Sequence, residues 1–306
     1  MSSIKPRHES PAEEYKNKCL SPEELNIELK ALVLNGTPTS AAKMGMVEAM
    51  SVYHYLLRKE KGHKTEYQGI GQLMFINAGI FPPTVESFDQ FNETYLSYFS
   101  DLDLFGMWIW GPEPCGEYEK LVYDEYTTNA SLCFGGDWMP FFLDEGEEPW
   151  TAKLKGKKVL VISPFAATIA EQYKKREKIW ESNPDVLPAF DLETIKCPLS
   201  AGISDSPFAD WTEGLHAMED IMDKTDFDVC FVGAGAWGLP LAVHARRLGK
   251  IGIHGGGDTQ LLFGIKGKRW DDNPAMSKKL YNEHWVRPSK SESPTNRKFI
   301  EDGCYW

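Results

Sequence analysis

Short apolar runs alternate with longer segments of helical periodicity through the second half of the chain. Each run is bounded by glycine, proline or charged residues, as is typical of strands that are buried on both faces. In chain order, the pattern predicts a strand at 159–162, a helix at 168–180, a strand at 194–197, a helix at 210–224, a strand at 228–232, a helix at 239–248 and a strand at 250–254. This alternation predicts an α/β fold: a Rossmann-like parallel sheet with right-handed crossovers and helices on both faces.

The first half of the chain has a less regular pattern. Residues 1–20 combine serine, proline and charge with few apolar positions, so we expect them to be disordered. The pattern then predicts a helix from Ser21 to near Leu34, a helix from Val47, a buried strand at 73–76, a helix at 85–99, a strand at 105–110 and a covering loop or linker at 137–150. We therefore divide the chain into a disordered N-terminus (1–20), an N-terminal half (21–150), a Rossmann-like half (151–270) and a C-terminal tail (271–306).

Glycine turns and basic residues concentrate between residues 226 and 270. The sequence G-x-G-x-x-G begins at Gly233, directly after a predicted strand, and a second glycine turn follows the next strand. Such turns let backbone N–H groups and the positive end of a helix approach a phosphate closely. Ligands of parallel sheets bind outside the carboxyl ends of the strands, so we predict a site for a phosphorylated ligand there. The residues expected to bind its nucleotide or diphosphate are Ser163, Thr168, Gly233, Gly235, Trp237, Gly255, Gly256, Lys266, Lys268 and Arg269.

The motif G-x-G-x-x-G is also typical of NAD- or FAD-binding proteins, but an expected acid is missing. Those sites usually place Asp or Glu about 20 residues further on, at the end of the next strand, where it holds the ribose. Here that strand ends at His254 and Gly255, and the first acid is Asp258, beyond the turn. A tight turn without any ligand is a further interpretation. We favour a phosphate site because a second glycine turn and a basic loop follow the motif.

The composition is typical of a soluble globular protein. The 306 residues are 42% hydrophobic and 25% charged, and the formal net charge of −12 argues against general nucleic-acid binding. The chain has no apolar run of about 18 residues and no apolar signal segment at its N-terminus. Its six cysteines lack C-x-x-C spacing. We therefore expect a soluble, cytoplasmic protein with no membrane span and no structural zinc.

Two segments carry a family resemblance: LKGKKVLVISPFAATIAEQYKKR (154–176) and GAGAWGLPLAVHARRLGKIGIHGGGDTQLLFGIKGKRW (233–270). They resemble uncharacterised polysaccharide-cluster proteins that are similar to glycosyltransferases of the GT-D fold, with relatives in bacteria and large DNA viruses. The resemblance covers roughly residues 40–270, and the run FGIKGKRW is its most specific part. It implies one Rossmann-like domain for a nucleoside-diphosphate sugar, with catalytic and acceptor elements supplied by the N-terminal half, and transfer of the sugar to a glycan or glycoprotein.

One motif departs from the pattern of that family. GT-D enzymes carry an Asp-x-Glu whose carboxylates help to hold a divalent metal on the diphosphate. This chain has KMGMVE at 43–48, so Glu48 is kept and Met46 occupies the Asp position. Mg²⁺ or Mn²⁺ bound to a diphosphate usually uses one or two carboxylates. Metal dependence is therefore open, with Glu48 the one candidate ligand, and we favour Lys266, Lys268 and Arg269 as the groups that neutralise the diphosphate.

Inverting glycosyl transfer also needs a group that takes the proton of the acceptor hydroxyl. Glu48 is the first candidate, because the resemblance places it at the active site, and His254 and Asp258 follow. Asn77 and Asp137 are candidates on the acceptor side. Tryptophans of the N-terminal half could stack on sugar rings or pack in the core: Trp108, Trp110, Trp138 and Trp150.

Several candidates have a structural interpretation as well. Ser163 and Thr168 are suited to helix capping, and Asp258 could cap the helix that follows it. Trp237 could pack in the core instead of contacting a base, and a histidine at a strand end, such as His254, is often held by structural hydrogen bonds. The residue types alone do not separate the two interpretations.

Taken with the resemblance, these features predict a GT-D-like glycosyltransferase, inverting, that uses a nucleoside-diphosphate sugar. The family favours UDP, and its viral relatives point to a pentose such as xylose. An NAD(P)- or FAD-binding oxidoreductase and a non-catalytic nucleotide-sugar-binding protein are the alternatives.

Overall fold

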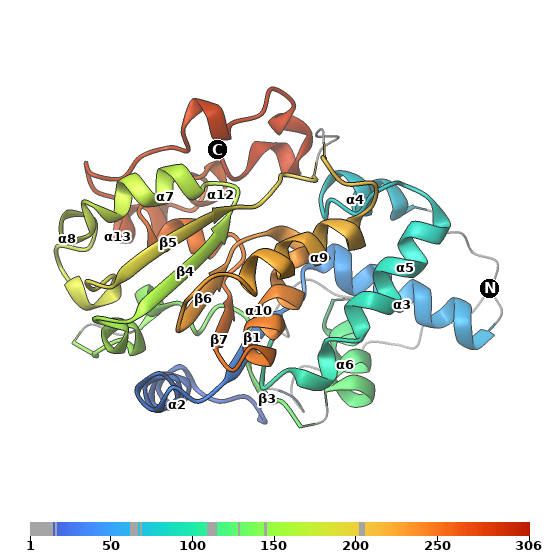
Figure 1. The fold of residues 1–306 in the computed structure, drawn as a ribbon, viewed down its shortest axis with the longest axis horizontal. Helices are drawn as coiled ribbons and strands as arrows, with labels where there is room; N and C mark the ends of the chain where they lie inside the picture. Colours follow the sequence, from blue (N-terminus) through green and yellow to red (C-terminus); the bar gives the residue numbers. More distant parts are fainter. Residues whose placement is uncertain are drawn as a thin grey trace.

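A computed structural model describes residues 15, 17–61, 67, 69–108, 115–127, 129–143, 146–201 and 206–306. One sheet of parallel strands runs through the molecule in the order β3-β2-β1-β7-β6-β4-β5 (Figure 1). The strands are β1 (Thr39–Lys43), β2 (Leu104–Met107), β3 (Ser131–Phe134), β4 (Lys158–Ser163), β5 (Asp191–Lys196), β6 (Val229–Val232) and β7 (Ile251–His254). Strands of both halves of the chain belong to this sheet, because β1 pairs with β7. The predicted α/β, Rossmann-like fold is confirmed.

Helices connect the strands and cover both faces of the sheet. The α-helices are α2 (Pro22–Asn35), α3 (Met46–Lys61), α4 (Gly71–Ile76), α5 (Val85–Leu96), α6 (Cys115–Tyr126), α7 (Ala166–Tyr173), α8 (Arg176–Ile179), α9 (Trp211–Met222), α10 (Gly238–Arg247), α11 (Asp258–Leu262), α12 (Lys268–Asp271) and α13 (Pro274–Leu280). The 3₁₀ helices are η1 (Phe99–Asp101), η2 (Pro140–Phe142), η3 (Trp150–Leu154), η4 (Pro184–Val186), η5 (Gly235–Trp237), η6 (Lys290–Glu292), η7 (Arg297–Phe299) and η8 (Glu301–Gly303).

The core is divided by the sheet into two layers. Along β4, Val159 and Val161 face one layer, whereas Leu160 and Ile162 face the other. The first layer includes side chains of α2, α7 and α11, and the second includes side chains of α3, α5, α9 and α10. Successive side chains of a strand point to opposite faces, so a strand buried on both faces is a continuous apolar run. This is why β4 and β6 can be recognised in the sequence.

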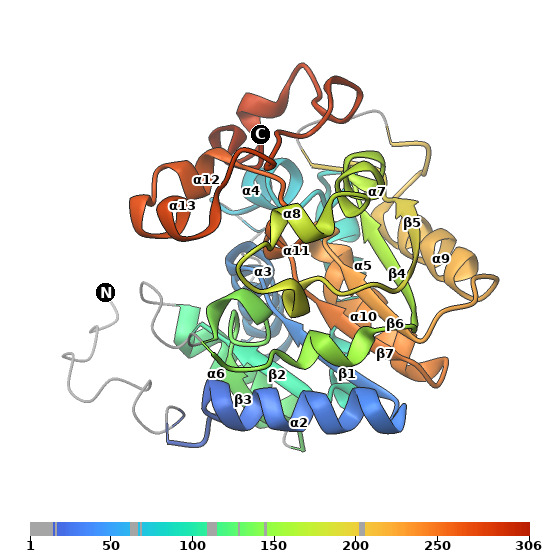
Figure 2. The ribbon, with the colours of Figure 1, turned by 90° about the vertical axis from the view of Figure 1, so that its left-hand side faces the viewer.

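The loops after β4 and β6 diverge. These neighbouring strands are followed by α7 and α10, which belong to different layers of the core. In parallel α/β sheets, such a divergence opens a crevice beyond the carboxyl ends of the strands. Figures 1 and 2 show the C-terminal segment (271–306), drawn in red, at this end of the sheet.

The segment 73–76 was predicted to be a strand and is helical, as part of α4. Met74 is buried, whereas Leu73 is exposed over 39% of its surface. One buried side chain per turn is the pattern of a surface helix, and a run of four apolar residues cannot distinguish this from a strand. The prediction was therefore wrong because the run is too short to have a readable period.

The elements β1, β3 and α6 were not predicted. Strand β1 contains Ser40, Ala41 and Ala42 and has no large apolar side chain. It pairs with β7, against which α10 packs closely: a Cβ on Gly252 of β7 would lie 1.9 Å from the carbonyl oxygen of Ala242. Small residues under a closely packed helix leave no apolar run, so this central strand is not visible in the pattern.

The two ends of the chain differ in what the structure describes. Most of the predicted disordered segment 1–20 lies outside the described residues, as does Trp110 at the end of the predicted strand 105–110. Tyr15 is described and buried, and its hydroxyl donates a hydrogen bond to Asp124. The C-terminal segment packs on the body, where Trp306 contacts Phe165 edge to face.

None of the described helices is long and apolar enough to cross a membrane.

Candidate functional site

A cavity of about 690 Å³ lies at the carboxyl ends of the central strands. The ends of β1, β4 and β7 contribute Lys43, Ser163 and His254, and the turn after β6 contributes Gly233 and Gly235. Predicted residues among its lining are Glu48, Asn77, Ser163, Gly233, Gly235, His254, Gly256, Asp258 and Arg269. Lining residues that were not predicted to act there include Lys43, Glu119, Gln260, Ile300, Glu301, Tyr305 and Trp306.

The glycine turn after β6 depends on two of its glycines. Gly235 has φ +54°, in the left-handed region that a side chain disfavours. A Cβ on Gly238 would lie 2.2 Å from Nε2 of His254, so the start of α10 can rest against this imidazole only without a side chain. In the part of the chain that the structure describes, the backbone N–H groups of Gly235 and Gly257 donate to no other group. The two turns therefore present unpaired donors beside the cavity, as phosphate sites do.

Lys43 and Asp258 form a buried ion pair across the cavity wall. The Lys43 ammonium lies 3.1 Å from the Asp258 carboxylate and also lies over the ring of Trp108, 4.9 Å from its centre. The Lys43 side chain is only 7% exposed. Removing one partner of such a pair would leave a buried charge without compensation. This cation comes from β1, which has no recognisable apolar pattern, so it could not be identified as a site residue from the sequence.

His254 is held as a neutral ring. Its Nδ1 lies 3.0 Å from the Lys43 carbonyl oxygen, to which it can only donate. Burial, together with the nearby Lys43 charge, lowers the pKa of His254 to about 3. A group with so low a pKa is a weak proton acceptor at neutral pH, and Nε2 faces Gly238. Its surroundings favour the structural interpretation of this histidine.

Glu48 lies in the first turn of α3 with its carboxylate folded back over Gly45. A Cβ on Gly45 would lie 2.1 Å from Oε2 of Glu48, so this close approach requires glycine. Burial raises the pKa of Glu48 to about 7, although its own backbone N–H favours the charged form. A carboxylate that titrates near neutral pH can both accept and return a proton, as a general base must.

A second buried carboxylate, Glu119 of α6, lines the same cavity and was not predicted. It accepts a hydrogen bond of 2.8 Å from the backbone N–H of Trp108. Burial raises the pKa of Glu119 to about 8, and the hydrogen bond only partly offsets this effect. The carboxyl group is thus mostly protonated at neutral pH and can donate a hydrogen bond into the cavity. No motif marks it, because α6 has no periodic pattern strong enough to place it.

Arg269 is the one residue of the predicted basic trio that lines the cavity. Its guanidinium pairs with the carboxylate of Glu301 and lies over the ring of Tyr305, 4.9 Å from its centre. Both partners belong to the C-terminal segment. An anionic ligand at Arg269 would therefore have to exchange with Glu301 or share the guanidinium with it.

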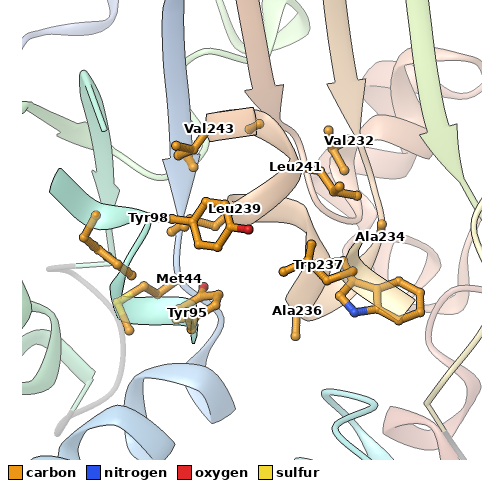
Figure 3. Close-up of a cluster of buried hydrophobic side chains, with 14 of the residues drawn as sticks. Met44, Tyr95, Tyr98, Val232, Ala234, Ala236, Trp237, Leu239, Leu241 and Val243 are labelled. Atoms are coloured by element: carbon orange, nitrogen blue, oxygen red, sulfur yellow. The ribbon is translucent and has the colours of Figure 1, made fainter. Parts of the chain in front are cut away.

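Several residues predicted to bind the nucleotide do not line the cavity. Thr168 donates its hydroxyl to the carboxylate of Glu292, which also accepts the backbone N–H of Ala167. Glu292 thus occupies the N-terminus of α7, where the sequence predicts a phosphate. Trp237 is buried, and its indole N–H donates to the Trp211 carbonyl oxygen. Figure 3 shows it in a cluster of buried hydrophobic side chains, which supports the packing interpretation.

The other predicted residues also lie outside the lining of the cavity. The Lys266 ammonium lies over the ring of Tyr281, and Lys268 is exposed at the start of α12. Gly255 packs against Thr259. Asp137 lies in the turn after β3, where burial raises its pKa to about 6. Gly255 and Lys268 are sequence neighbours of residues that line the cavity, but short turns send neighbouring side chains in different directions.

The residues present do not fit a protein-held divalent metal. In the described part of the chain, no group of three His, Cys, Asp or Glu side chains could hold such an ion. Met46, at the position of the family aspartate, lies half exposed on the cavity wall and offers no oxygen ligand. Of the four carboxylates that line the cavity, Asp258 and Glu301 are already paired with cations.

Comparisons of the chain with protein-family models, with curated proteins and with solved structures find no match. The resemblance to GT-D glycosyltransferases therefore stays a prediction from the sequence.

Proposed function

We propose that the protein is a glycosyltransferase that binds a nucleoside-diphosphate sugar in this cavity. The observation that carries the proposal is the meeting of three groups in one cavity: Glu48, a carboxylate that titrates near neutral pH, Arg269, and the N–H of Gly235, which donates to no described residue. Sugar transfer needs a proton acceptor for the acceptor hydroxyl and positive groups for the departing diphosphate. The cavity volume is within the usual range for small-molecule sites.

In the proposed inverting reaction, Glu48 takes the proton of an acceptor hydroxyl while that oxygen bonds to the anomeric carbon. The bond from this carbon to the diphosphate breaks, and the leaving group keeps the electron pair. Arg269 and the N–H groups of the glycine turns stabilise its charge. Glu119, protonated at neutral pH, is suited to donate a hydrogen bond to a substrate oxygen.

The identities of donor and acceptor rest on the family resemblance. It favours UDP as the nucleotide, a pentose such as xylose as the sugar, and a glycan or glycoprotein as the acceptor. Asn77 and Trp108 line the cavity from the N-terminal half and are the side chains we place beside the acceptor.

The first test is thermal unfolding of the full chain with UDP, GDP, dTDP, CMP, NAD⁺ or FAD, each with EDTA or with Mn²⁺. A ligand at 100 times its Kd stabilises by about 2.7 kcal/mol, which raises the Tm of a chain of this size by a few degrees. We expect one nucleoside diphosphate to raise the Tm, and to do so in EDTA. A shift with NAD⁺ or FAD alone would refute the transferase and support an oxidoreductase, and no shift with any ligand would favour a protein without this activity.

Adjacent basic residues provide a matched pair of variants for the same assay. Arg269 lines the cavity and Lys268 does not, although both are exposed cations of α12. Arg269→Gln should weaken nucleoside-diphosphate binding by roughly 10- to 150-fold, because a charge-assisted hydrogen bond contributes roughly 1.5–3 kcal/mol. Lys268→Gln should change it less than twofold. Equal effects of the two variants would contradict the proposed position of the diphosphate.

A further inference from the structure

A second pocket lies on the C-terminal segment, next to the candidate cavity. Its volume is about 410 Å³, and its lining consists of Arg287, Pro288, Lys290, Ser293, Arg297 and Trp306. We call it the basic pocket. Trp306 also lines the cavity at the strand ends, so this residue forms a wall between the two spaces. No Asp or Glu is among the described residues that line the basic pocket.

Two acidic side chains of the same C-terminal segment are engaged elsewhere. Glu292 is buried against the start of α7, and Glu301 pairs with Arg269 on the cavity side. Arg287 has a partner in Asp271. Lys290 and Arg297 have no ion pair with any described residue. In a chain with a net charge of −12, two cations in one pocket that form no ion pair with a described residue indicate a local site for an anion.

The pocket combines this charge with an aromatic surface. Trp306 is half-buried, with its indole N–H donated to the Glu292 carbonyl oxygen, so the ring is held in place. Aromatic rings pack against the apolar faces of sugar rings, and arginine pairs with carboxylate or phosphate through two parallel hydrogen bonds. An anionic sugar satisfies both features at once, whereas a simple anion uses only the cations.

We propose that the basic pocket binds an anionic sugar of the acceptor glycan, with its carboxylate or phosphate on Lys290 and Arg297. The neighbouring sugar then reaches past Trp306 into the cavity, where its hydroxyl meets Glu48. This assignment of an acceptor class rests on the proposed function, since it places the acceptor beside the donor site. It also predicts a preference for negatively charged glycans, although the protein itself has a net negative charge.

The test is calorimetric titration of the full chain with three trisaccharides of equal length and linkage: one of galacturonic acid, one of galactose, and the galactose form carrying one phosphate. We expect a charged trisaccharide to bind at least tenfold more tightly than the neutral one. A preference for the carboxylate or for the phosphate form identifies which anionic sugar is the ligand. Equal binding of all three, or no binding of any, would overturn the proposal.

Variants distinguish direct contact of the glycan with the basic pocket from attraction by any positive charge of this segment. Lys290→Gln combined with Arg297→Gln should weaken binding of the charged trisaccharide about tenfold and that of the neutral one less than twofold. Lys298→Gln is the matched control, because Lys298 is exposed in the same 3₁₀ helix as Arg297 and does not line the pocket. A loss with Lys298→Gln as large as with the double variant would refute a specific site. Unfolding of each variant by urea checks that it is folded.

Nucleotide binding is measured on the same variants, so that the two proposals can fail separately. The Lys290→Gln, Arg297→Gln variant should bind nucleoside diphosphate as the unchanged protein does. Nucleotide binding with no preference for charged glycans would refute the basic pocket alone. A preference for charged glycans without any nucleotide binding would refute the transferase and leave an anionic-glycan-binding protein.

Discussion

Two buried carboxylates lie at the starts of helices that follow strands of the sheet, and their surroundings differ. Glu292 reaches α7 from the C-terminal segment and accepts hydrogen bonds from the backbone of Ala167 and from the hydroxyls of Thr168 and Ser289. Glu48 lies within α3, the helix that follows β1, where burial raises its pKa to about 7. Several donors stabilise a charged carboxylate, whereas burial favours the protonated form. The carboxylate of Glu292 is thus held by several hydrogen-bond donors, whereas Glu48 is a group that can exchange a proton near neutral pH.

The two strand–helix junctions after β4 and β6 also differ in the backbone N–H groups that they leave for a ligand. The amides at the start of α7 are already satisfied by Glu292, so the junction after β4 has little left to offer a phosphate. In the turn after β6, the N–H of Gly235 donates to none of the residues that the structure describes. This difference favours the β6 turn for the proposed phosphate contact, although residues at both junctions were predicted to make one.

The largest expected effect comes from Glu48→Gln. Loss of a general base typically lowers the rate by 10²–10⁴-fold, and we expect a loss in this range for sugar transfer from the nucleoside-diphosphate sugar that binds. For the unchanged protein, the rate should rise with pH through about 7, because the base must be deprotonated. Release of nucleoside diphosphate measures both. An unchanged rate would remove Glu48 from the mechanism.

Stability of the Glu48→Gln protein serves as the control. The folded-state pKa of Glu48 is raised, so its contribution to stability is present at low pH and is lost as pH rises from the unfolded value through about 7. The glutamine variant lacks this titration and should lose less stability over that range. Urea unfolding at pH 5 and pH 8 compares the two proteins. An equal loss in both would show that the burial of Glu48 does not penalise its charge.

Glu292→Gln should lower the stability of the protein and leave the rate of sugar transfer nearly unchanged. The amide cannot accept all of the hydrogen bonds that the carboxylate accepts, and its NH₂ group would face donors. We expect the free energy of unfolding to fall by about 2–3 kcal/mol, with little change in the rate per folded molecule. The matched control is Glu283→Gln, at a residue of the same segment whose side chain is 83% exposed and should contribute less than about 0.5 kcal/mol. A similar small loss in both variants would contradict the structural role.

The smallest effect is expected for Glu301→Gln, which frees Arg269 for a ligand. This ion pair is partly exposed, and such pairs contribute roughly 0.2–1 kcal/mol. Affinity for the nucleoside diphosphate should therefore rise about two- to fivefold in calorimetric titration. Asp302→Asn removes an exposed neighbouring charge without touching Arg269. If both variants raise the affinity equally, the cause is the loss of a negative charge near the cavity, and not the release of Arg269 from Glu301.

The sequence was informative where the fold imposes a strong local pattern. Strands β4 and β6 are buried on both faces, and their apolar runs were predicted at the right places. The G-x-G-x-x-G was correctly placed after β6, because Gly235 needs its left-handed backbone and Gly238 its missing side chain. Strand β1 was missed because its residues are small, and with it the cation Lys43.

The charges that line the cavity are set by contacts between residues that are far apart in the sequence, which no local pattern predicts. Lys43 meets Asp258 across 215 positions of sequence, and Arg269 meets Glu301 in the C-terminal segment. Thr168 and Trp237 were plausible binders by position, but Glu292 and the core of α10 already occupy their side chains. Sequence spacing reports which residues follow one another, whereas availability for a ligand depends on what packs against them.

By itself, the sequence determined the α/β class, the parallel strands of the second half and the glycine turn at their carboxyl ends, because each follows from backbone geometry and burial within a short segment. Only the tertiary structure decided which charges meet in the cavity, which carboxylates keep a proton near neutral pH, and that the C-terminal segment forms one wall of the cavity. The physical reason is that burial and ion pairing are properties of the assembled environment. The same glutamate side chain is held by several hydrogen-bond donors at position 292 and has a pKa raised by burial at position 48, because different distant residues surround it.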